Sequence, residues 1–158
     1  MKALVLYGST SGNTRFLSDF VSSGLEAAGF EVVVKNARDT HRDELLVYDL
    51  LVFGSSTWDG KKVDGLSARD QNAAVQGRLQ VDMRAFVESL HGFDLQQKPC
   101  AIFAVGHYSY TYTCNAAHLL EEAISSCNGK RIVETFRVSD VVDLSADAIE
   151  QWAKEIRV

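Results

Sequence analysis

Near its N-terminus the chain reads Ala3-Leu4-Val5-Leu6-Tyr7-Gly8-Ser9-Thr10-Ser11-Gly12-Asn13-Thr14. The first five of these residues form an apolar run with the length of a buried strand. A turn rich in hydroxyl and amide side chains follows at once, and behind it comes a stretch with helical periodicity. The sequence therefore predicts a strand, a tight turn and a helix in direct succession.

The turn has the composition of a phosphate-binding loop. N–H groups at a helix start point outward without partners, and the helix dipole adds positive potential there. Further neutral hydrogen-bond donors are available around Gly12, from the side chains of Ser9, Thr10, Ser11, Asn13 and Thr14. We therefore expect a phosphate monoester held mainly by uncharged groups. The alternative is an ordinary capped turn, because Ser, Thr and Asn are also the usual helix N-caps.

Two other phosphate motifs fit this turn less well. A P-loop needs four residues between its glycines and then a lysine, whereas three residues separate Gly8 from Gly12 and Asn13 replaces the lysine. The dinucleotide-binding pattern needs glycine where Thr10 and Asn13 stand. The sequence thus disfavours a nucleoside triphosphate or a dinucleotide as the ligand.

Length and composition indicate a single domain over residues 1–158, since 46% of the residues are hydrophobic and can form one sizeable core. The formal net charge of −5 disfavours nucleic acid and anionic membranes as partners and is compatible with a basic protein partner. The first residues carry no basic leader and no long apolar stretch, so neither a signal peptide nor a membrane span is expected.

The three cysteines, Cys100, Cys114 and Cys127, show no C-x-x-C spacing, which indicates neither a disulfide framework nor a thiolate metal site. We therefore expect a reducing, cytoplasmic location. Cys100 and Cys127 are interpreted as small buried residues. Cys114 is not expected to be a nucleophile, because its only neighbouring base is His118, and such a pair four residues apart is common by chance.

Apolar runs of strand length alternate with segments of helical periodicity, which is typical of a βαβ protein. The expected strands are 2–7, 30–36, 49–54, 99–105 and 131–138. The expected helices are 13–28, 42–47, 80–91, 114–127 and 145–156. Left-handed C-caps are expected at Gly29 and Gly129, and Ser145 is expected to cap the last helix.

The fold class predicted from this alternation is a three-layer α/β/α sandwich. The runs 50–53 and 101–105 are apolar without alternation, as central strands covered on both faces should be. Right-handed crossovers arrange five parallel strands in the order 2-1-3-4-5, and ligands bind beyond the carboxyl ends between strands 1 and 3. The loops after Tyr7, Phe53 and Val105 are thus expected to form the site.

The second and third of these loops are rich in aromatic side chains. They read Gly54-Ser55-Ser56-Thr57-Trp58-Asp59-Gly60 and Gly106-His107-Tyr108-Ser109-Tyr110-Thr111-Tyr112-Thr113-Cys114. Such side chains in one crevice suit a flat, π-rich ligand, and the alternative is that they fill local core. The polar segment 61–79 shows no clear period, which is typical of a functional lid or of a surface loop.

Taken together, these loops closely resemble those of the flavodoxins over essentially the whole chain. The resemblance is carried by Gly8 to Thr14, Ser55 to Trp58, Ser109 to Cys114 and Ile149-Glu150-Gln151-Trp152-Ala153. It implies a flavodoxin-like fold and one noncovalently bound flavin mononucleotide (FMN). It also implies a low-potential carrier of single electrons, with no catalytic residue and no metal.

By this resemblance the FMN phosphate lies in the loop from Ser9 to Thr14, and the flavin ring lies between Trp58 and Tyr110. Backbone groups of Gly106 and its neighbours, with Cys114, would meet the pyrimidine edge of the ring, while Asp59 and Gly60 would face its N5 atom. The full set of implied cofactor contacts is Ser9, Thr10, Ser11, Gly12, Asn13, Thr14, Ser56, Thr57, Trp58, Asp59, Gly60, Gly106, His107, Tyr110, Tyr112, Thr113 and Cys114.

The chain departs from the family pattern in its charges. His107 stands where close relatives of the family commonly have an acidic residue, and Lys61 and Lys62 follow the Trp loop where acidic residues often occur. Because the reduced flavin is an anion, these positions predict a less negative potential that falls as His107 loses its proton. The alternative is that all three side chains are solvated without effect, or that the lysines contact a partner.

Two other functions compete with a carrier that docks weakly, as a monomer, to a flavodoxin reductase-type donor and a redox acceptor. An FMN-dependent NAD(P)H:quinone reductase would share the phosphate loop but needs an open ring face and a second pocket. A signalling receiver domain shares the strand order, but it requires acidic residues after strand 1 and at the end of strand 3. This chain has Gly8-Ser9 and Gly54-Ser55 there, so that function is set aside.

Overall fold

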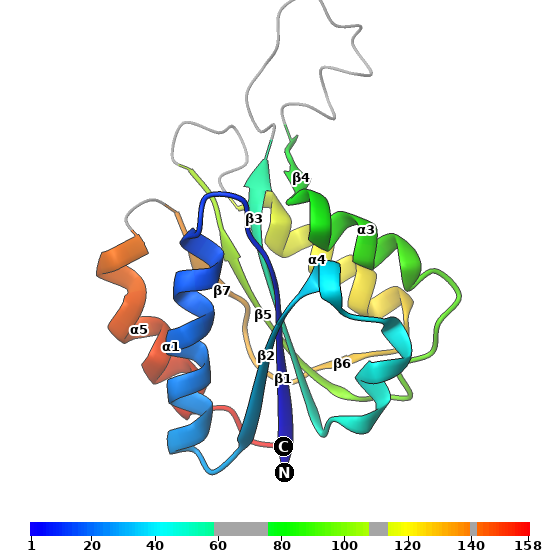
Figure 1. Ribbon diagram of the computed structural model, residues 1–158, viewed down its shortest axis with the longest axis horizontal. Coiled ribbons are helices and arrows are strands. Elements are labelled where there is room, and N and C mark those ends of the chain that lie inside the picture. The colour runs from blue at the N-terminus through cyan, green and yellow to red at the C-terminus, as the bar shows by residue number, and fades with distance from the viewer. Residues whose placement is uncertain (59–75, 108–113, 140–141) are drawn as a thin grey trace, which may run out of the picture.

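The fold is described from a computed structural model, which covers residues 1–58, 76–107, 114–139 and 142–158 (Figure 1). One twisted sheet runs through the centre of the molecule, and its parallel strands follow the apolar runs of the sequence. The strands are β1 (Lys2–Gly8), β2 (Glu31–Asn36), β3 (Leu50–Trp58), β4 (Arg78–Leu79), β5 (Pro99–Val105), β6 (Lys130–Arg131) and β7 (Phe136–Val138).

Helices cover both faces of this sheet, which gives three layers (Figure 1). The α-helices are α1 (Asn13–Ala27), α3 (Val81–Ser89), α4 (Asn115–Ser126) and α5 (Val142–Lys154). Two 3₁₀ helices, η1 (Ala37–Asp39) and η2 (Arg42–Val47), connect β2 to β3, and η2 is the short helix expected at 42–47. Among the described helices, none is both long and apolar enough to cross a bilayer.

Alternation along β1 divides the core into two halves. Leu4 and Leu6 belong to a buried cluster that includes α3 and α4, whereas Ala3 and Val5 belong to one that includes α1 and α5. Both clusters consist of fully or nearly fully buried side chains. Burial on both faces explains why the central strands read as continuous apolar runs.

The sheet order confirms the expected topology. The path is β2-β1-β3-β5-β6, with β7 also paired to β5, and all of these pairs are parallel. Leu6 lies opposite Phe53 and Tyr7 opposite Gly54, so the carboxyl ends of β1 and β3 adjoin. The loops after these strands therefore meet at one edge of the sheet, as the strand order predicts.

The expected strand at 131–138 is wrong as a single element. It forms two short strands, β6 and β7, because Glu134 and Thr135, which lie between them, bond to helices. The Glu134 carbonyl accepts from Trp152 Nε1 on α5 at 3.0 Å, and Thr135 Oγ1 donates to the Glu121 carboxylate on α4 at 2.5 Å. A further short strand, β4, pairs antiparallel with the end of β3, which extends to Trp58 beyond its expected end.

One of the two expected glycine C-caps is confirmed and the other is wrong. Gly29 has a φ of 94°, whereas Asn128, not Gly129, adopts the left-handed conformation after α4, with a φ of 59°. Gly129 instead fills a tight place, since a Cβ atom there would lie 2.7 Å from Cγ2 of Ile124. The expected cap at Ser145 is also wrong, because α5 begins at Val142, and the Val142 side chain is part of the buried face of this helix.

Helices α1 and α5 approach closely at a second glycine, which yields a prediction about stability. A Cβ atom on Gly24 would lie 2.3 Å from the backbone oxygen of Glu150 and 2.7 Å from the Cβ of Ala153. We expect Gly24→Ala to lower the free energy of unfolding by about 1–3 kcal/mol through overpacking. Helix propensity alone predicts a gain of about 0.5–1 kcal/mol for the same change.

Urea unfolding of the flavin-free protein measures this difference. Ser23→Ala, at the exposed neighbouring position of α1, is the control and should leave stability unchanged or slightly raised. Equal or greater stability of the Gly24→Ala protein would show that the contact between α1 and α5 tolerates a methyl group.

Candidate functional site

The loop between β1 and α1 leaves the start of α1 open to a ligand. Gly12 is the N-cap residue, in the left-handed conformation with a φ of 94°, and no side chain caps the helix. Within the turn, Gly12 N donates to Ser9 Oγ at 3.1 Å. The first-turn N–H groups of α1 therefore point outward without a cap, and the ordinary capped turn considered for this sequence is disfavoured.

The buried hydroxyl of Thr14 is the most informative feature of this loop. Its side chain is only 1% exposed, yet its Oγ1 has no hydrogen-bond partner among the described residues. A buried hydroxyl without a partner costs about 1–3 kcal/mol, so such groups normally have one. Lying in the first turn of an uncapped helix, this hydroxyl fits a phosphate oxygen as its partner.

A cation that the sequence reasoning did not weigh, Arg15, directly follows this loop. Arg15, in the first turn of α1, donates from Nη1 to the hydroxyl of Tyr7 at 3.2 Å and lies 5.6 Å from the centre of the Tyr7 ring. Its Nε also lies 3.7 Å from the Asp19 carboxylate. The hydrogen bond to Tyr7, with the charge of Asp19, raises the pKa of Arg15. Its charge thus stands beside a loop whose remaining donors are neutral.

At the end of β3, the side chains of Ser56, Thr57 and Trp58 make different contacts. The indole of Trp58 is 37% exposed and donates from Nε1 to Ser56 Oγ at 2.9 Å, which holds the ring in one orientation. Thr57 is buried, and its Oγ1 accepts from the backbone N of Ala116 at 3.0 Å at the start of α4. Trp58 therefore presents a large, fixed aromatic face, while the Thr57 hydroxyl joins β3 to α4.

The loop after β5 is anchored on one carbonyl of β7. Gly106 N donates to the Val138 oxygen at 2.8 Å, and Cys114 Sγ donates to the same oxygen at 3.2 Å. His107, the next residue, is exposed. Gly106 and Cys114 therefore lie close together beside the end of β7, and this is the same end of the sheet as the phosphate loop.

The cysteines have inert surroundings. Burial raises the pKa of Cys114, which keeps the thiol protonated, and His118 is paired with Glu122 at 3.3 Å. Cys100 and Cys127 are buried, as expected from the sequence, and burial raises the pKa of Cys100 to about 12. Protonated thiols are poor nucleophiles, so these contacts do not support thiol chemistry.

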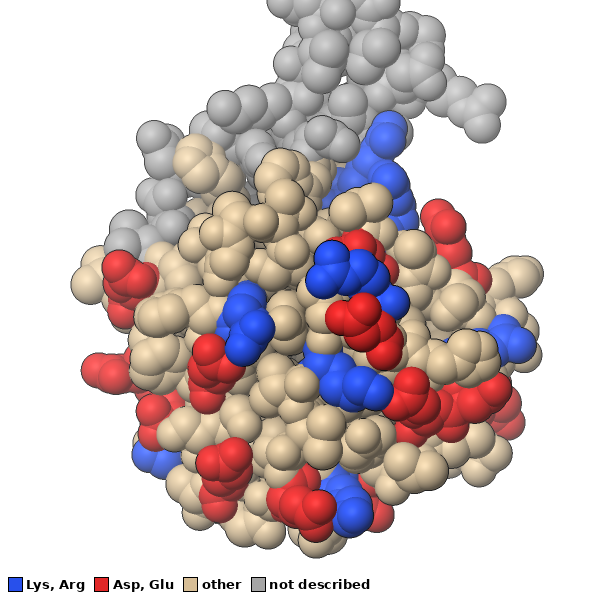
Figure 2. Space-filling model, viewed as in Figure 1, with Lys and Arg blue, Asp and Glu red and all other residues tan. Residues whose placement is uncertain are grey.

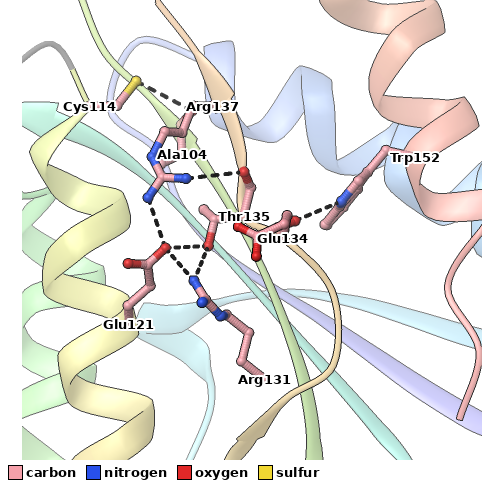
Figure 3. A network of polar contacts seen from close by, with 8 residues as sticks. All are labelled: Ala104, Cys114, Glu121, Arg131, Glu134, Thr135, Arg137 and Trp152. Atoms are coloured by element: carbon pink, nitrogen blue, oxygen red, sulfur yellow. Dashed lines mark hydrogen bonds and ion pairs between the residues drawn. The ribbon is translucent and has the colours of Figure 1, made fainter.

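A polar network fixes the split strand that carries Val138 (Figure 3). The carboxylate of Glu121, on α4, accepts from Arg131 at 2.7 Å, from Thr135 at 2.5 Å and from Arg137 at 2.8 Å. Burial raises the pKa of Glu121, but the Thr135 hydrogen bond and the charges of Arg137 and Arg131 prevail and lower it. This network holds α4, β6 and β7 together beneath the loop after β5.

Several residues expected to contact the ligand lie outside the described residues, namely Asp59, Gly60, Tyr110, Tyr112 and Thr113. The described ones gather at the carboxyl ends of β1, β3 and β5. The sequence reasoning missed Gln80, whose side chain reaches Thr10 in the phosphate loop. Only its place just before an apolar helical stretch could have signalled a cap, and nothing in the sequence signals the contact with Thr10.

These features define a class: a three-layer α/β/α protein that binds a phosphorylated ligand at the topological switch point, beside an exposed indole. A family model of the flavodoxins matches residues 5–152. The chain therefore belongs to the flavodoxin family. As a member it is an FMN-binding electron carrier, and the open start of α1 with the buried Thr14 hydroxyl fits the phosphate of that cofactor.

Individual relatives agree with the family match. A flavodoxin of Maridesulfovibrio salexigens is 30% identical over 156 residues, covering 98% of this chain and 96% of the relative. The crystal structure of oxidised flavodoxin 2 from Bacillus cereus superposes with a TM-score of 0.81 at 26% identity, covering 97% of this chain and 95% of that one. The sulfite reductase [NADPH] flavoprotein alpha-component of Bacillus subtilis is 30% identical over 132 residues, which are 81% of this chain and 19% of that protein.

The unpartnered hydroxyl of Thr14 predicts opposite effects on stability and on binding. Thr14→Val keeps the shape and removes the hydroxyl, so the flavin-free protein should be as stable as the parent or more stable. FMN should bind about 10- to 150-fold more weakly, since a hydrogen bond to a charged group contributes about 1.5–3 kcal/mol.

Quenching of flavin fluorescence gives the two dissociation constants, and urea unfolding gives the stability. Riboflavin, which has no phosphate, is the control ligand, and its affinity should change little. An equal loss of FMN and riboflavin affinity would place the Thr14 hydroxyl away from the phosphate.

Proposed function

We propose that this protein carries single electrons between redox partner proteins on one noncovalently bound FMN, whose phosphate lies in the loop from Ser9 to Thr14. The observation that carries the proposal is the buried Thr14 hydroxyl, which has no partner in the described part of the chain and lies at the uncapped start of α1. FMN supplies reversible one-electron chemistry when bound. The task of the protein is to bind it, orient it and exclude water.

We assign contacts with the flavin ring to the residues at and after the ends of β3 and β5. Trp58, fixed by its bond to Ser56, provides an apolar plane on which an aromatic ring stacks favourably. We assign the opposite plane to Tyr110, and the pyrimidine edge to the backbone at Gly106 and to Cys114. The Val138 carbonyl supports that edge, because both Gly106 and Cys114 donate to it. Asp59 and Gly60 are assigned to the N5 side.

No acid, base or nucleophile is assigned to the chain, since electron transfer requires none. The contacts of Cys114 and His118 support this assignment, as both groups are engaged elsewhere. The similarity to a segment of the sulfite reductase flavoprotein component also favours electron relay between larger partners. A quinone reductase-type enzyme is not favoured.

The partners are proposed to be a flavodoxin reductase-type donor and a redox acceptor, bound weakly and transiently by a monomer in the cytoplasm. On the face in Figure 2, acidic and basic side chains are interspersed and neither sign forms one continuous field. Modest electrostatic steering of this kind suits brief encounters rather than tight complexes. The free thiols of Cys100, Cys114 and Cys127 are compatible with a reducing compartment.

Reconstitution with FMN followed by two assays tests this function. The purified protein alone should not oxidise NADPH, and it should pass electrons to cytochrome c only when a flavodoxin reductase and NADPH are added. Steady NADPH oxidation by the protein alone would overturn the carrier function in favour of the enzyme. Failure to bind FMN at all would remove both.

The charge at position 107 predicts a shift in potential. A unit negative charge roughly 10 Å from the flavin, at an effective dielectric constant of about 40, opposes an added electron by about 0.8 kcal/mol. His107→Asp should therefore lower the more negative one-electron potential by about 40 mV, because for a one-electron couple a shift of about 59 mV corresponds to a factor of ten, or about 1.4 kcal/mol.

Potentiometric titration with dithionite at a fixed pH measures this shift. His91→Asp makes the same change at an exposed histidine just after the C-terminal end of α3, outside the three loops, and should shift the potential less. A potential that is unchanged or higher in the His107→Asp protein would show that this position does not tune the flavin.

A further inference from the structure

Gln80 stands at the start of α3 and is nearly inaccessible to solvent, with 1% of its surface exposed. Its Oε1 accepts from the backbone N of Asp82 at 2.8 Å and of Met83 at 3.1 Å, which caps the helix. Its Nε2 donates to Thr10 Oγ1 at 3.1 Å and to the Asp82 carboxylate at 3.1 Å. A single side chain therefore joins α3 to the phosphate loop.

The partners of this amide leave only one orientation for it. Backbone N–H groups can only donate, and a carboxylate can only accept, so Oε1 must face the helix start and Nε2 must face Asp82. The second hydrogen of Nε2 then points to Thr10, whose oxygen is the acceptor. It follows that the hydroxyl hydrogen of Thr10 is directed away from Gln80 and is available to another acceptor.

The end of β1 is shaped to admit this amide. A Cβ atom on Gly8 would lie 2.3 Å from Gln80 Oε1 and 2.8 Å from the Cβ of Met83. Any larger residue at this position would push α3 away from the loop. Glycine is thus required here by the close approach of Gln80 and Met83.

The backbone of Gln80 is tied to the strand that carries the indole. Its N–H group lies 3.1 Å from both Ser55 Oγ and the Ser56 carbonyl oxygen. Ser56 in turn accepts the indole N–H of Trp58 through its own hydroxyl. One buried residue therefore contacts both halves of the site, the phosphate loop through its side chain and β3 through its backbone.

We propose that Gln80 is a positioning residue for the FMN phosphate: by donating to Thr10 Oγ1 it turns the Thr10 hydroxyl into a donor aimed at the phosphate. This rests on the proposed placement of the phosphate in the loop from Ser9 to Thr14. Gln80 does not touch the phosphate in this account. It fixes the direction of a hydroxyl that would otherwise rotate, and it holds the loop against α3.

The test is a double-mutant cycle on FMN affinity. Gln80→Glu keeps an oxygen that accepts from Asp82 N and Met83 N, but when its carboxyl group is ionised it has no donor for Thr10, so the Thr10 hydroxyl turns to the carboxylate instead. Thr10→Val removes the hydroxyl altogether. Any repulsion between the new carboxylate and the phosphate is present with or without the hydroxyl, and it therefore cancels in the cycle.

The readout is the ratio of FMN to riboflavin affinity, measured by fluorescence quenching. We expect Gln80→Glu to lower this ratio by about 10- to 100-fold in the parent and by at least about fivefold less in the Thr10→Val background. Riboflavin affinity should change by less than about twofold, because riboflavin has no phosphate. Gln151→Glu, the same change on the exposed side of α5, is the control and should leave the ratio unchanged.

Equal effects of Gln80→Glu in the two backgrounds would overturn the proposal, because they would show that Gln80 does not act through Thr10. If the parent protein binds FMN and riboflavin equally well, the phosphate site itself is wrong, and that outcome is distinct from a failure of Gln80 alone. Should Gln80→Glu not fold, the same cycle with Gln80→Met applies, with a smaller coupling of the same sign expected, because the Thr10 hydroxyl then loses its donor but is not turned toward a carboxylate.

Discussion

Helix α1 begins directly behind β1, at a left-handed glycine and without a side-chain cap, and the N–H groups of its first turn are left for a ligand. A phosphate placed there receives several converging donors and the favourable end of the helix dipole without any lysine. The rest of the architecture follows from keeping this turn in place. β1 is central in the sheet and paired on both sides, so the position of the turn is fixed by the core.

Such a site has a cost in the absence of its ligand, and Thr14 shows where that cost lies. A fully buried hydroxyl with no partner among the described residues destabilises the flavin-free protein, and a valine in its place would fit as well. Sequences retain such unfavourable groups mainly where function requires them. The absence of a partner therefore carries more information about function here than the many satisfied polar groups do.

Sequence reasoning succeeded where the signal is local or periodic and failed where it depends on distant contacts. The apolar runs predicted the central strands and their order, because strands buried on both faces leave a clear pattern. The expected last strand fails because Thr135 is drawn to Glu121 on α4, and the expected cap at Ser145 fails because Val142 extends the buried stripe of α5. Gln80 was missed for the same reason, since its partner Thr10 is 70 residues away in the chain.

The site itself divides along similar lines. Ser9 to Thr14 and Trp58 lie together at the carboxyl ends of adjoining strands, and their contacts with the cofactor, like those of Tyr110 and Asp59, stay predictions. What composition could not predict is the internal support. Buried hydrogen bonds that satisfy every donor and acceptor rigidify the groups they join. The Gln80 side chain has this character, because it is buried and both its amide oxygen and its amide nitrogen have partners, and it links Thr10 to Ser55 and Ser56; the loop for the phosphate and the strand that carries the indole should therefore move as one unit. A carrier that exchanges electrons in brief encounters benefits from such a frame, because a site held in place before binding needs little rearrangement when the charge of its cofactor changes.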